Sequence, residues 1–454
     1  MSAVRPPRVA VATGPPLPPD GSGLVARVIH NSGWLAGAYV TAFALAFVLN
    51  AVLARSLQPE RYGVLAVVLS LVTFVQLLLG SRVWEATTTF VTEFRARGDA
   101  ARATATVKLC YLVDALGAVL GFALLQAIAE PAARIFSVEA AAPSIRLFAW
   151  SLLLAIPVST GTALLRLADR YRWLAVHTVG ENLVRLVAVG AVILVVGPRL
   201  VPVVGAYLVA SAVSSAVVVW LAARAGRELV LARWADAPLS LLRADRRRIW
   251  SFLAYSNLSG TARLITGRVD VLIVGWLTDP ASTGAYRLAR TVSDPLAAFA
   301  TPVSQAVFPE LSRLVQARDA TSIRTLTARI RSFAAAVVLP VCALTVLLAG
   351  WAVPAIFGEA FADAVPMVRI MVWQLVWLPY VWLPGLLLAL GRARTVAAMT
   401  AVDAAAYLVL LVGLTSAFGA VGAAWATLLR FVAWTALASV VAARVDRGLE
   451  PAWA

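Results

Sequence analysis

The sequence has few of the residues from which soluble enzymes build charged surfaces, disulfides and metal sites. Charged residues make up 14% of the 454 positions, against about 25% in a typical soluble domain. The two cysteines, Cys110 and Cys342, each lie in a long apolar run and predict neither a disulfide framework nor a metal site. The sequence contains no phosphate-binding glycine loop, metal-ligand cluster or nucleophile constellation. No catalytic residue, metal ligand or resident cofactor is therefore predicted.

Apolar segments long enough to cross a membrane recur along the whole chain. Hydrophobic residues make up 61% of the sequence, and a transmembrane helix needs about 20 consecutive apolar residues. We therefore predict an all-α polytopic membrane protein with about 12 transmembrane helices. The predicted spans are 33–54, 63–80, 107–129, 145–165, 176–197, 201–223, 250–277, 284–308, 333–350, 366–390, 395–417 and 420–442.

The basic residues predict the orientation of these spans. Loops on the side of the N-terminus carry 27 of the 39 Lys and Arg residues, and the opposite side carries 7. Because Lys and Arg are retained on the cytoplasmic side, both termini are predicted to be cytoplasmic. Membrane topology thus accounts for the formal charge of +16, and nucleic acid is not expected as a partner. Residues 1–27 are rich in proline and lack an apolar core, which predicts a cytoplasmic tail and not a signal peptide.

The two halves of the chain resemble each other at an offset of about 220 positions. The pair Ile-Phe at 135–136 recurs at 356–357, and Val-Gly-Ala at 204–206 recurs at 421–423. Because each half has an even number of spans, the copies would share one orientation and be related by a pseudo-two-fold axis along the membrane normal. The predicted organisation is a tail at 1–27, a six-helix lobe at 28–223, a basic linker at 224–249, a second six-helix lobe at 250–443 and a cytoplasmic tail at 444–454.

The linker between the lobes combines arginines with apolar residues. Leu229, Trp234 and Leu242 are interleaved with these arginines, as in an amphipathic helix that lies on an anionic membrane surface. A basic cytoplasmic loop without any recognition role is the alternative.

Polar residues interrupt the predicted seventh span. Spacings of three, four and three residues place one group of them on a single helix face: Gly260, Arg263, Gly267 and Asp270. A charge at mid-membrane costs about 2.5–3.5 kcal/mol on insertion scales, so it normally faces protein or a water-filled cavity. We therefore predict a cavity for a negatively charged ligand, bound first by Arg263 and second by Arg268. Arginine suits a phosphate because its planar, permanently charged group donates paired hydrogen bonds.

Asp270, Asn50 and Arg290 complete the candidate ligand-binding residues. Asp270 would either neutralise Arg263 in the empty protein or pair with Arg287 or Arg290 of the eighth span. Asn50 occupies the equivalent position in the first span, which indicates a polar pair across the two lobes. Arg290 would lie at the outer mouth of the cavity or in a network at the membrane edge.

Several carboxylates within predicted spans are candidates for coupling to a proton or a sodium ion. A carboxylate in a low-dielectric interior can bind and release a cation, but it is also commonly paired with an arginine for structural reasons. The spacings Glu181–Arg185 and Arg290–Asp294 are those of helical ion pairs. The coupling candidates are Asp114, Glu181, Asp294 and Asp403.

At several of these positions the sequence resembles the lipid-linked oligosaccharide flippases of bacterial polysaccharide biosynthesis. The resemblance covers about residues 30–445. Its most specific stretches are NAVLARSLQPERYGVLA at 50–66 and GRVDVLIVGWLTDPASTGAYRLA at 267–289, followed by 301–314, 164–175 and 418–428. The family belongs to a superfamily (the multidrug/oligosaccharidyl-lipid/polysaccharide exporters) that also contains multidrug exporters and peptidoglycan-precursor flippases.

The resemblance implies a fold, a substrate and partners. Two six-helix lobes would form a V around a cationic cavity and work by alternating access in the bacterial cytoplasmic membrane. The substrate would be a polyprenyl-diphosphate glycan, moved from the cytoplasmic to the outer leaflet of the bilayer. Polysaccharide polymerases and glycosyltransferases would be partners. Some relatives carry two further helices, which are not expected here.

Other functions remain open from the sequence. A cation-coupled multidrug exporter of the same fold should carry cavity carboxylates for cationic drugs. A membrane glycosyltransferase or polymerase would need a sizeable loop with catalytic carboxylates, whereas the longest predicted outer connection spans about 130–144. A purely structural scaffold would leave the buried charges unexplained.

Overall fold

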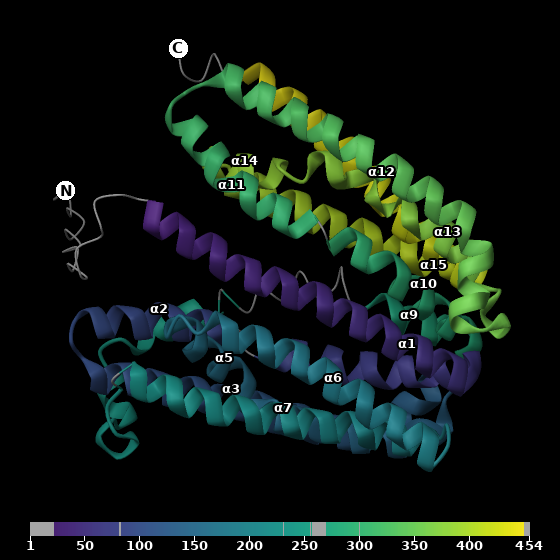
Figure 1. Cartoon of the computed structure of the whole chain (residues 1–454), viewed down its shortest axis with the longest axis horizontal. Helices are drawn as coiled ribbons and strands as arrows, with labels where there is room; N and C mark the ends of the chain where they lie inside the picture. Colours follow the sequence, from purple (N-terminus) through teal and green to yellow (C-terminus); the bar gives the residue numbers. More distant parts are fainter. Residues whose placement is uncertain are drawn as a thin grey trace.

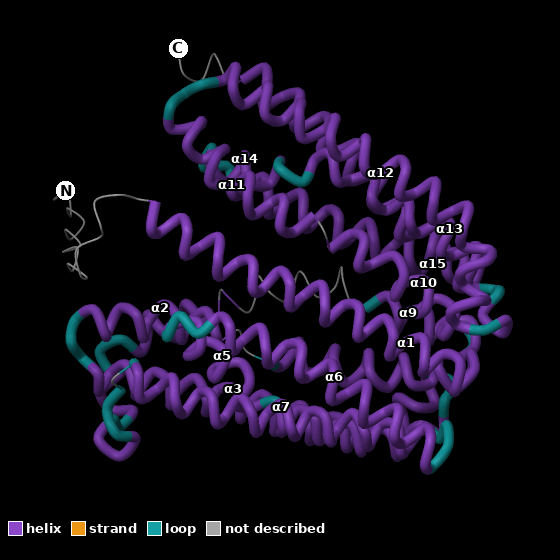
Figure 2. Tube along the Cα trace, viewed as in Figure 1, coloured by secondary structure: helices purple, strands orange, loops and turns teal. Residues whose placement is uncertain are grey.

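The computed structural model describes residues 22–80, 83–229, 231–254, 256, 269–298 and 300–448. Within these ranges the chain consists of helices joined by loops and contains no β-strand (Figure 2). Eight helical segments are long and apolar enough to cross a membrane. The predicted all-α polytopic membrane architecture is therefore confirmed.

The helices form two bundles. The N-terminal bundle consists of α1 (Ser22–Leu79), α2 (Val83–Ala96), α3 (Ala100–Ile135), α4 (Ala142–Leu154), α5 (Ile156–Leu167), α6 (Tyr171–Val195) and α7 (Leu200–Glu228). The C-terminal bundle consists of α9 (Asp270–Leu277), α10 (Pro280–Ala298), α11 (Ala300–Gln316), α12 (Ala320–Phe357), α13 (Ala364–Met371), a 3-10 segment (Val372–Tyr380), α14 (Leu383–Ala389) and α15 (Ala393–Gly448). The bundles lie together at one end and diverge toward the end where α1 begins and α15 ends (Figure 1). We call these the closed end and the divergent end.

Two of the long segments each contain two spans. Non-helical backbone joins two helices at Gln58 in α1 and at Gly419 in α15. With these junctions counted, the helices follow the order of the predicted spans. Residues 257–268 of the predicted seventh span, which include Arg263 and Arg268, lie outside the described residues.

Positive φ angles recur at equivalent positions in the two halves. Residues with positive φ occur in pairs 220 to 222 positions apart: Gly98 and Arg318, Ser137 and Gly358, Asp169 and Gly391, Gly197 and Gly419. Asp99 and Asp319 then cap α3 and α12, each accepting a hydrogen bond from the backbone amide three residues on. Hydrogen bonds from Ser322 hold the pKa of the Asp319 carboxyl below its usual range. The repeat in the sequence is thus also present in the backbone.

Small residues bring α1 and α10 into direct backbone contact at the closed end. A Cβ atom on Gly284 would lie 2.3 Å from the Pro59 carbonyl oxygen, and one on Gly63 would lie 1.7 Å from the Pro280 carbonyl oxygen. Glycine is therefore required on both sides of this contact, because any side chain would collide with backbone atoms.

Polar and aromatic contacts join the bundles at the same end. The Arg55 guanidinium donates from Nε to the Ile356 carbonyl oxygen at 2.8 Å and also bonds the Ala355 carbonyl. These carbonyls lie in the last turn of α12, where helix carbonyls lack partners within the helix. The Tyr62 and Phe361 rings meet edge to face, with centroids 5.7 Å apart. α1 thus binds the C-terminal bundle through side chains as well as through its backbone.

α10 is the most polar of the long helices near this contact. It packs against α1, α9, α13 and α15, and it is not among the eight apolar segments. Tyr286, Leu288 and Ala289 are buried against these neighbours. A helix with two arginines can lie at membrane depth here because protein, and not lipid, surrounds it.

The basic linker is not one continuous helix over its described residues. After α7 ends at Glu228, the described residues form short 3-10 turns at Trp234–Asp236 and Leu239–Leu242. Leu229, Ala237 and Leu242 are buried in the core at the divergent end of the N-terminal bundle. Trp234 and Leu239, in contrast, are exposed. Some of the interleaved apolar residues therefore pack against this bundle, and contact between the linker and a membrane surface stays a prediction.

Candidate functional site

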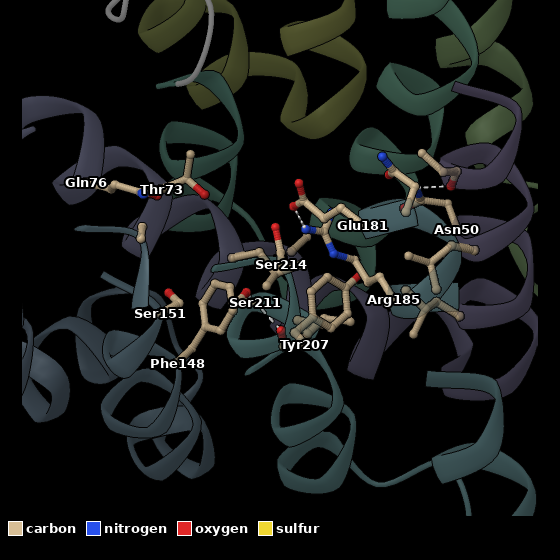
Figure 3. Close-up of a pocket in the computed structure, with 18 of the residues that line it drawn as sticks. Asn50, Thr73, Gln76, Phe148, Ser151, Glu181, Arg185, Tyr207, Ser211 and Ser214 are labelled. Atoms are coloured by element: carbon tan, nitrogen blue, oxygen red, sulfur yellow. Dashed lines mark hydrogen bonds and ion pairs between the residues drawn. The ribbon is translucent and has the colours of Figure 1, made fainter. Parts of the chain in front are cut away.

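A cavity of about 410 Å³ lies inside the N-terminal bundle (Figure 3). Its walls come from α1, α4, α5, α6 and α7, and Arg287 of α10 completes them. Ten lining residues carry neutral groups that can donate or accept hydrogen bonds: Asn50, Tyr62, Thr73, Gln76, Ser151, Asn182, Tyr207, Ser211, Ser214 and Ser215. Such a lining is unusual in a membrane span, because each polar group lowers the tendency of its helix to enter lipid.

The positions of the lining residues place the cavity at mid-membrane depth. Asn50 stands seven residues before Leu57 at the closed end of α1, which corresponds to about 10 Å along the helix. Ser214 stands 14 residues after the start of α7 at Leu200, or about 21 Å. Both helix ends lie on the closed side, so the cavity occupies the middle of a bilayer about 30 Å thick.

Among the described residues that line the cavity, Glu181 and Arg185 form an ion pair. Arg185 donates to Glu181 at 2.5 Å, one helical turn away on α6, and its guanidinium carbon lies 5.6 Å from the Tyr207 ring centroid (Figure 3). The predicted spacing of a helical ion pair is therefore confirmed. The Arg185 Nε atom is buried without a hydrogen-bond partner among the described residues. The pair therefore adds no net charge to the cavity.

Asn50 lines this cavity and forms two hydrogen bonds through its side chain. Its side-chain amide donates to the Ala46 carbonyl at 2.7 Å, and its Oδ1 atom accepts from the Tyr62 hydroxyl at 2.8 Å. Both partners belong to α1. The polar pair between Asn50 and the second lobe stays a prediction, because residues 257–268 of the predicted seventh span lie outside the described residues.

A second group of polar residues joins α9 to α10. Asp270, which is 2% exposed, accepts hydrogen bonds from the Arg290 guanidinium and from the Tyr286 hydroxyl, the latter at 2.8 Å. Arg290 also donates from Nε to Asp294 at 2.9 Å. Of the partners considered for Asp270, Arg290 binds it, and Arg263 lies outside the described residues. The Arg290–Asp294 ion pair is confirmed.

Arg287 links this network to the cavity. It lines both the main cavity and a smaller one of about 50 Å³, which Asp270, Arg290 and Thr73 also line. Among the described residues it forms an ion pair with no carboxylate. Arg287 is therefore the cation that the described part of the site presents to a ligand.

The remaining candidate carboxylates differ in their partners. Asp403 is paired with Arg430, which donates from Nε to both carboxylate oxygens at 3.0 and 3.1 Å and from Nη2 at 2.7 Å. Asp114 accepts a hydrogen bond from the Thr160 hydroxyl at 3.3 Å and has no arginine partner among the described residues. Glu181, Asp294 and Asp403 thus have the structural pairing that was the alternative to a coupling role, and Asp114 does not.

The serines of the cavity were missed in the sequence. Ser211, Ser214 and Ser215 follow the spacing i, i+3 and i+4 and so share one face of α7. This spacing inside an apolar span was the signal that could have revealed the cavity. Neutral polar residues are a weaker signal than buried charges because they cost less to place in a membrane.

The fold is shared with membrane transporters of known structure. An inward-facing multidrug resistance MATE family transporter of the MOP superfamily is 15% identical, with a TM-score of 0.76 over 91% of this chain and 96% of that one. The lipid II flippase MurJ in an inward closed conformation is 11% identical, with a TM-score of 0.70 over 90% and 87%. A point mutant of the Vibrio cholerae MATE transporter VcmN is 15% identical, with a TM-score of 0.60 over 94% and 98%. These likenesses show that the chain shares the fold of these proteins.

A sequence family model assigns the chain more specifically than the fold does. The model of the polysaccharide biosynthesis protein family matches residues 52–366, which is more than half of the chain. No curated protein sequence matches the chain. The chain is therefore a member of the polysaccharide biosynthesis protein family, as the resemblance in its sequence indicated.

Proposed function

We propose that this protein flips a polyprenyl-diphosphate-linked oligosaccharide from the cytoplasmic to the outer leaflet of the bacterial cytoplasmic membrane. Transport would proceed by alternating access and serve the export of a surface polysaccharide. The prenyl chain can stay in lipid, but the sugars and the diphosphate cannot cross about 30 Å of hydrocarbon unaided. The protein must therefore replace water around neutral hydroxyl groups and around two phosphates.

The composition of the cavity supports this proposal most strongly. Its neutral hydroxyl and amide groups suit the hydroxyl groups of sugars, and Arg287 at its edge suits a phosphate. Arg290 lies beside Arg287 in the smaller cavity, next to Asp270. We assign the glycan to the main cavity and the diphosphate to Arg287, with Arg263 and Arg268 as further proposed phosphate ligands. Asn50 would bind the glycan.

The cytoplasmic orientation of both termini and the membrane partners belong to the same proposal. A polysaccharide polymerase and glycosyltransferases would consume and supply the lipid-linked glycan on opposite faces of the membrane. Among the candidate carboxylates, we favour Asp114 for coupling to a proton or a sodium ion because its described partner is the neutral Thr160.

Replacing Arg287 tests the proposal directly. In vesicles containing the purified protein and a polyprenyl-diphosphate disaccharide, oxidation by external periodate measures how fast the glycan changes leaflet. We expect Arg287→Ala to slow transfer about tenfold or more, because a charged hydrogen bond to phosphate is lost. Arg287→Lys should retain part of the rate, and the surface variant Arg313→Ala should retain all of it. Normal transfer by Arg287→Ala would remove this residue from the mechanism.

The rival function, export of cationic drugs, predicts a different behaviour of the cavity. Glu181 is the carboxylate among its described lining residues, and Arg185 neutralises it. We expect Arg185→Gln to free Glu181 and to raise the affinity for the cationic dye ethidium about tenfold over the wild type. The double variant Glu181→Gln, Arg185→Gln should bind the dye as weakly as the wild type. Wild-type binding as tight as that of the single variant would instead favour the drug exporter.

A further inference from the structure

A second, separate pocket lies at the divergent end of the N-terminal bundle. Its volume is about 230 Å³, and it is formed where α5, α6 and α7 meet. Leu165, Leu221 and Ala225 are buried and form its floor. Arg170, Trp173, Arg224 and Glu228 complete the lining. None of these residues lines the central cavity, so the proposed transport mechanism does not use them.

The rim of the pocket is held in place by two kinds of contact. Arg170 donates from Nε and Nη2 to the two carboxylate oxygens of Glu228, both at 2.9 Å. The guanidinium carbon of Arg224 lies 3.8 Å from the centroid of the Trp220 ring, which is a close cation–π contact. Arg224 forms no ion pair with a carboxylate among the described residues. The pocket therefore carries a net charge of one positive unit, presented by Arg224.

The lengths of two helices place this pocket at the membrane surface. Starting at Leu200, about 20 residues of α7 cross 30 Å of hydrocarbon, which brings Trp220 to the far boundary. Counting back the same distance from Val195 on α6 reaches a point about two residues from Trp173. Trp173 and Trp220 are 43% and 49% exposed, as expected for tryptophans at a membrane–water boundary. Arg170 and Arg224 lie just beyond them, at the depth of lipid phosphates.

We infer that this pocket binds the phosphodiester group of an anionic phospholipid from the surrounding leaflet. Arg224 would donate paired hydrogen bonds to the phosphate, and the acyl chains would lie along the exposed face of α7 beside Trp220. A zwitterionic lipid would add a positive amine beside Arg224, while Glu228 is already occupied by Arg170. The pocket thus selects for lipids without a headgroup cation.

The test uses the full-length protein in detergent, with bound lipids counted by native mass spectrometry. We expect the wild type to bind dioleoylphosphatidylglycerol about tenfold more tightly than dioleoylphosphatidylcholine, and Arg224→Gln to lose this preference. Arg227→Gln is the matched control because Arg227 lies on the same helix turn but outside the pocket lining. Its affinity for the anionic lipid should stay within about twofold of the wild type.

Three outcomes would overturn the inference. An equal loss for Arg224→Gln and Arg227→Gln would show a general attraction between basic residues and anionic lipid. Equal binding of both lipids by the wild type would show that the pocket does not discriminate between lipids by headgroup charge. Displacement of the anionic lipid by inorganic phosphate at similar concentration would assign the pocket to a free anion.

Discussion

Arg290→Met is expected to destabilise the protein strongly. After the substitution, Asp270 is still buried (2% exposed) but has lost its cationic partner. The neutral Tyr286 hydroxyl still donates to it. Breaking a buried ion pair on one side typically costs about 3–5 kcal/mol, and the total stability of a folded protein is only about 5–15 kcal/mol. The thermal unfolding midpoint of the purified protein in detergent should therefore fall sharply.

A second substitution distinguishes destabilisation by the lost ion pair from destabilisation by lost packing. Adding Asp270→Asn to Arg290→Met removes the uncompensated carboxylate, so the double variant should be more stable than the single one. Arg313→Met is a suitable control because Arg313 is 75% exposed and its pair with Glu310 lies at the surface. If Arg290→Met unfolds at the same temperature as this control, the network between α9 and α10 does not stabilise the fold.

Gly284→Ala is expected to open the closed end and to arrest transport. The new Cβ atom would lie 2.3 Å from the Pro59 carbonyl oxygen and 3.0 Å from the Gly63 amide nitrogen. Backbone atoms cannot move aside as a flexible side chain can, so α1 and α10 must separate. Spin labels at Glu60 and Glu359, both near this contact, should report a longer separation by pulsed electron resonance. Transfer of the glycan lipid should fall about tenfold or more because the closed state is lost.

The control for this prediction is a glycine without a close neighbour. Gly190 in α6 has no atom within 4 Å of a new Cβ. Alanine usually stabilises a helix relative to glycine by about 0.5–1 kcal/mol, so Gly190→Ala should be neutral or slightly stabilising. An unchanged label separation in Gly284→Ala, with normal transfer, would show that the α1–α10 contact does not close the protein.

Much of the fold could be predicted because a membrane permits few backbone arrangements. In hydrocarbon every backbone polar group must be bonded within the segment, so a long apolar run in this chain had to be a helix. The repeat was also readable, since the residues that end helices, such as Gly197 and Gly419, recur at a fixed offset. The linker was not predictable in the same way, because its Leu229 and Leu242 could be buried against either lipid or protein.

The candidate site was predictable in its charges but not in its partners. Helical spacing identified Glu181–Arg185 and Arg290–Asp294, because residues four apart on a helix are neighbours wherever the helix lies. The sequence offered several arginines as partners for Asp270. The contact with Arg290 follows from the packing of α9 on α10, which the sequence does not show. The binding roles proposed for Arg263 and Arg268 remain predictions, because both lie outside the described residues.

The polarity of α10 also has a consequence for how the protein is made. With Arg287, Arg290 and Asp294, this helix would face a barrier of several kcal/mol if it left the translocon into lipid by itself. α1, against which it packs, has already been synthesised when α10 emerges. Insertion of α10 into the membrane therefore requires that the first half of the chain is next to the translocon when α10 emerges. A second half produced as a separate polypeptide would insert correctly only if the first half were already in the membrane.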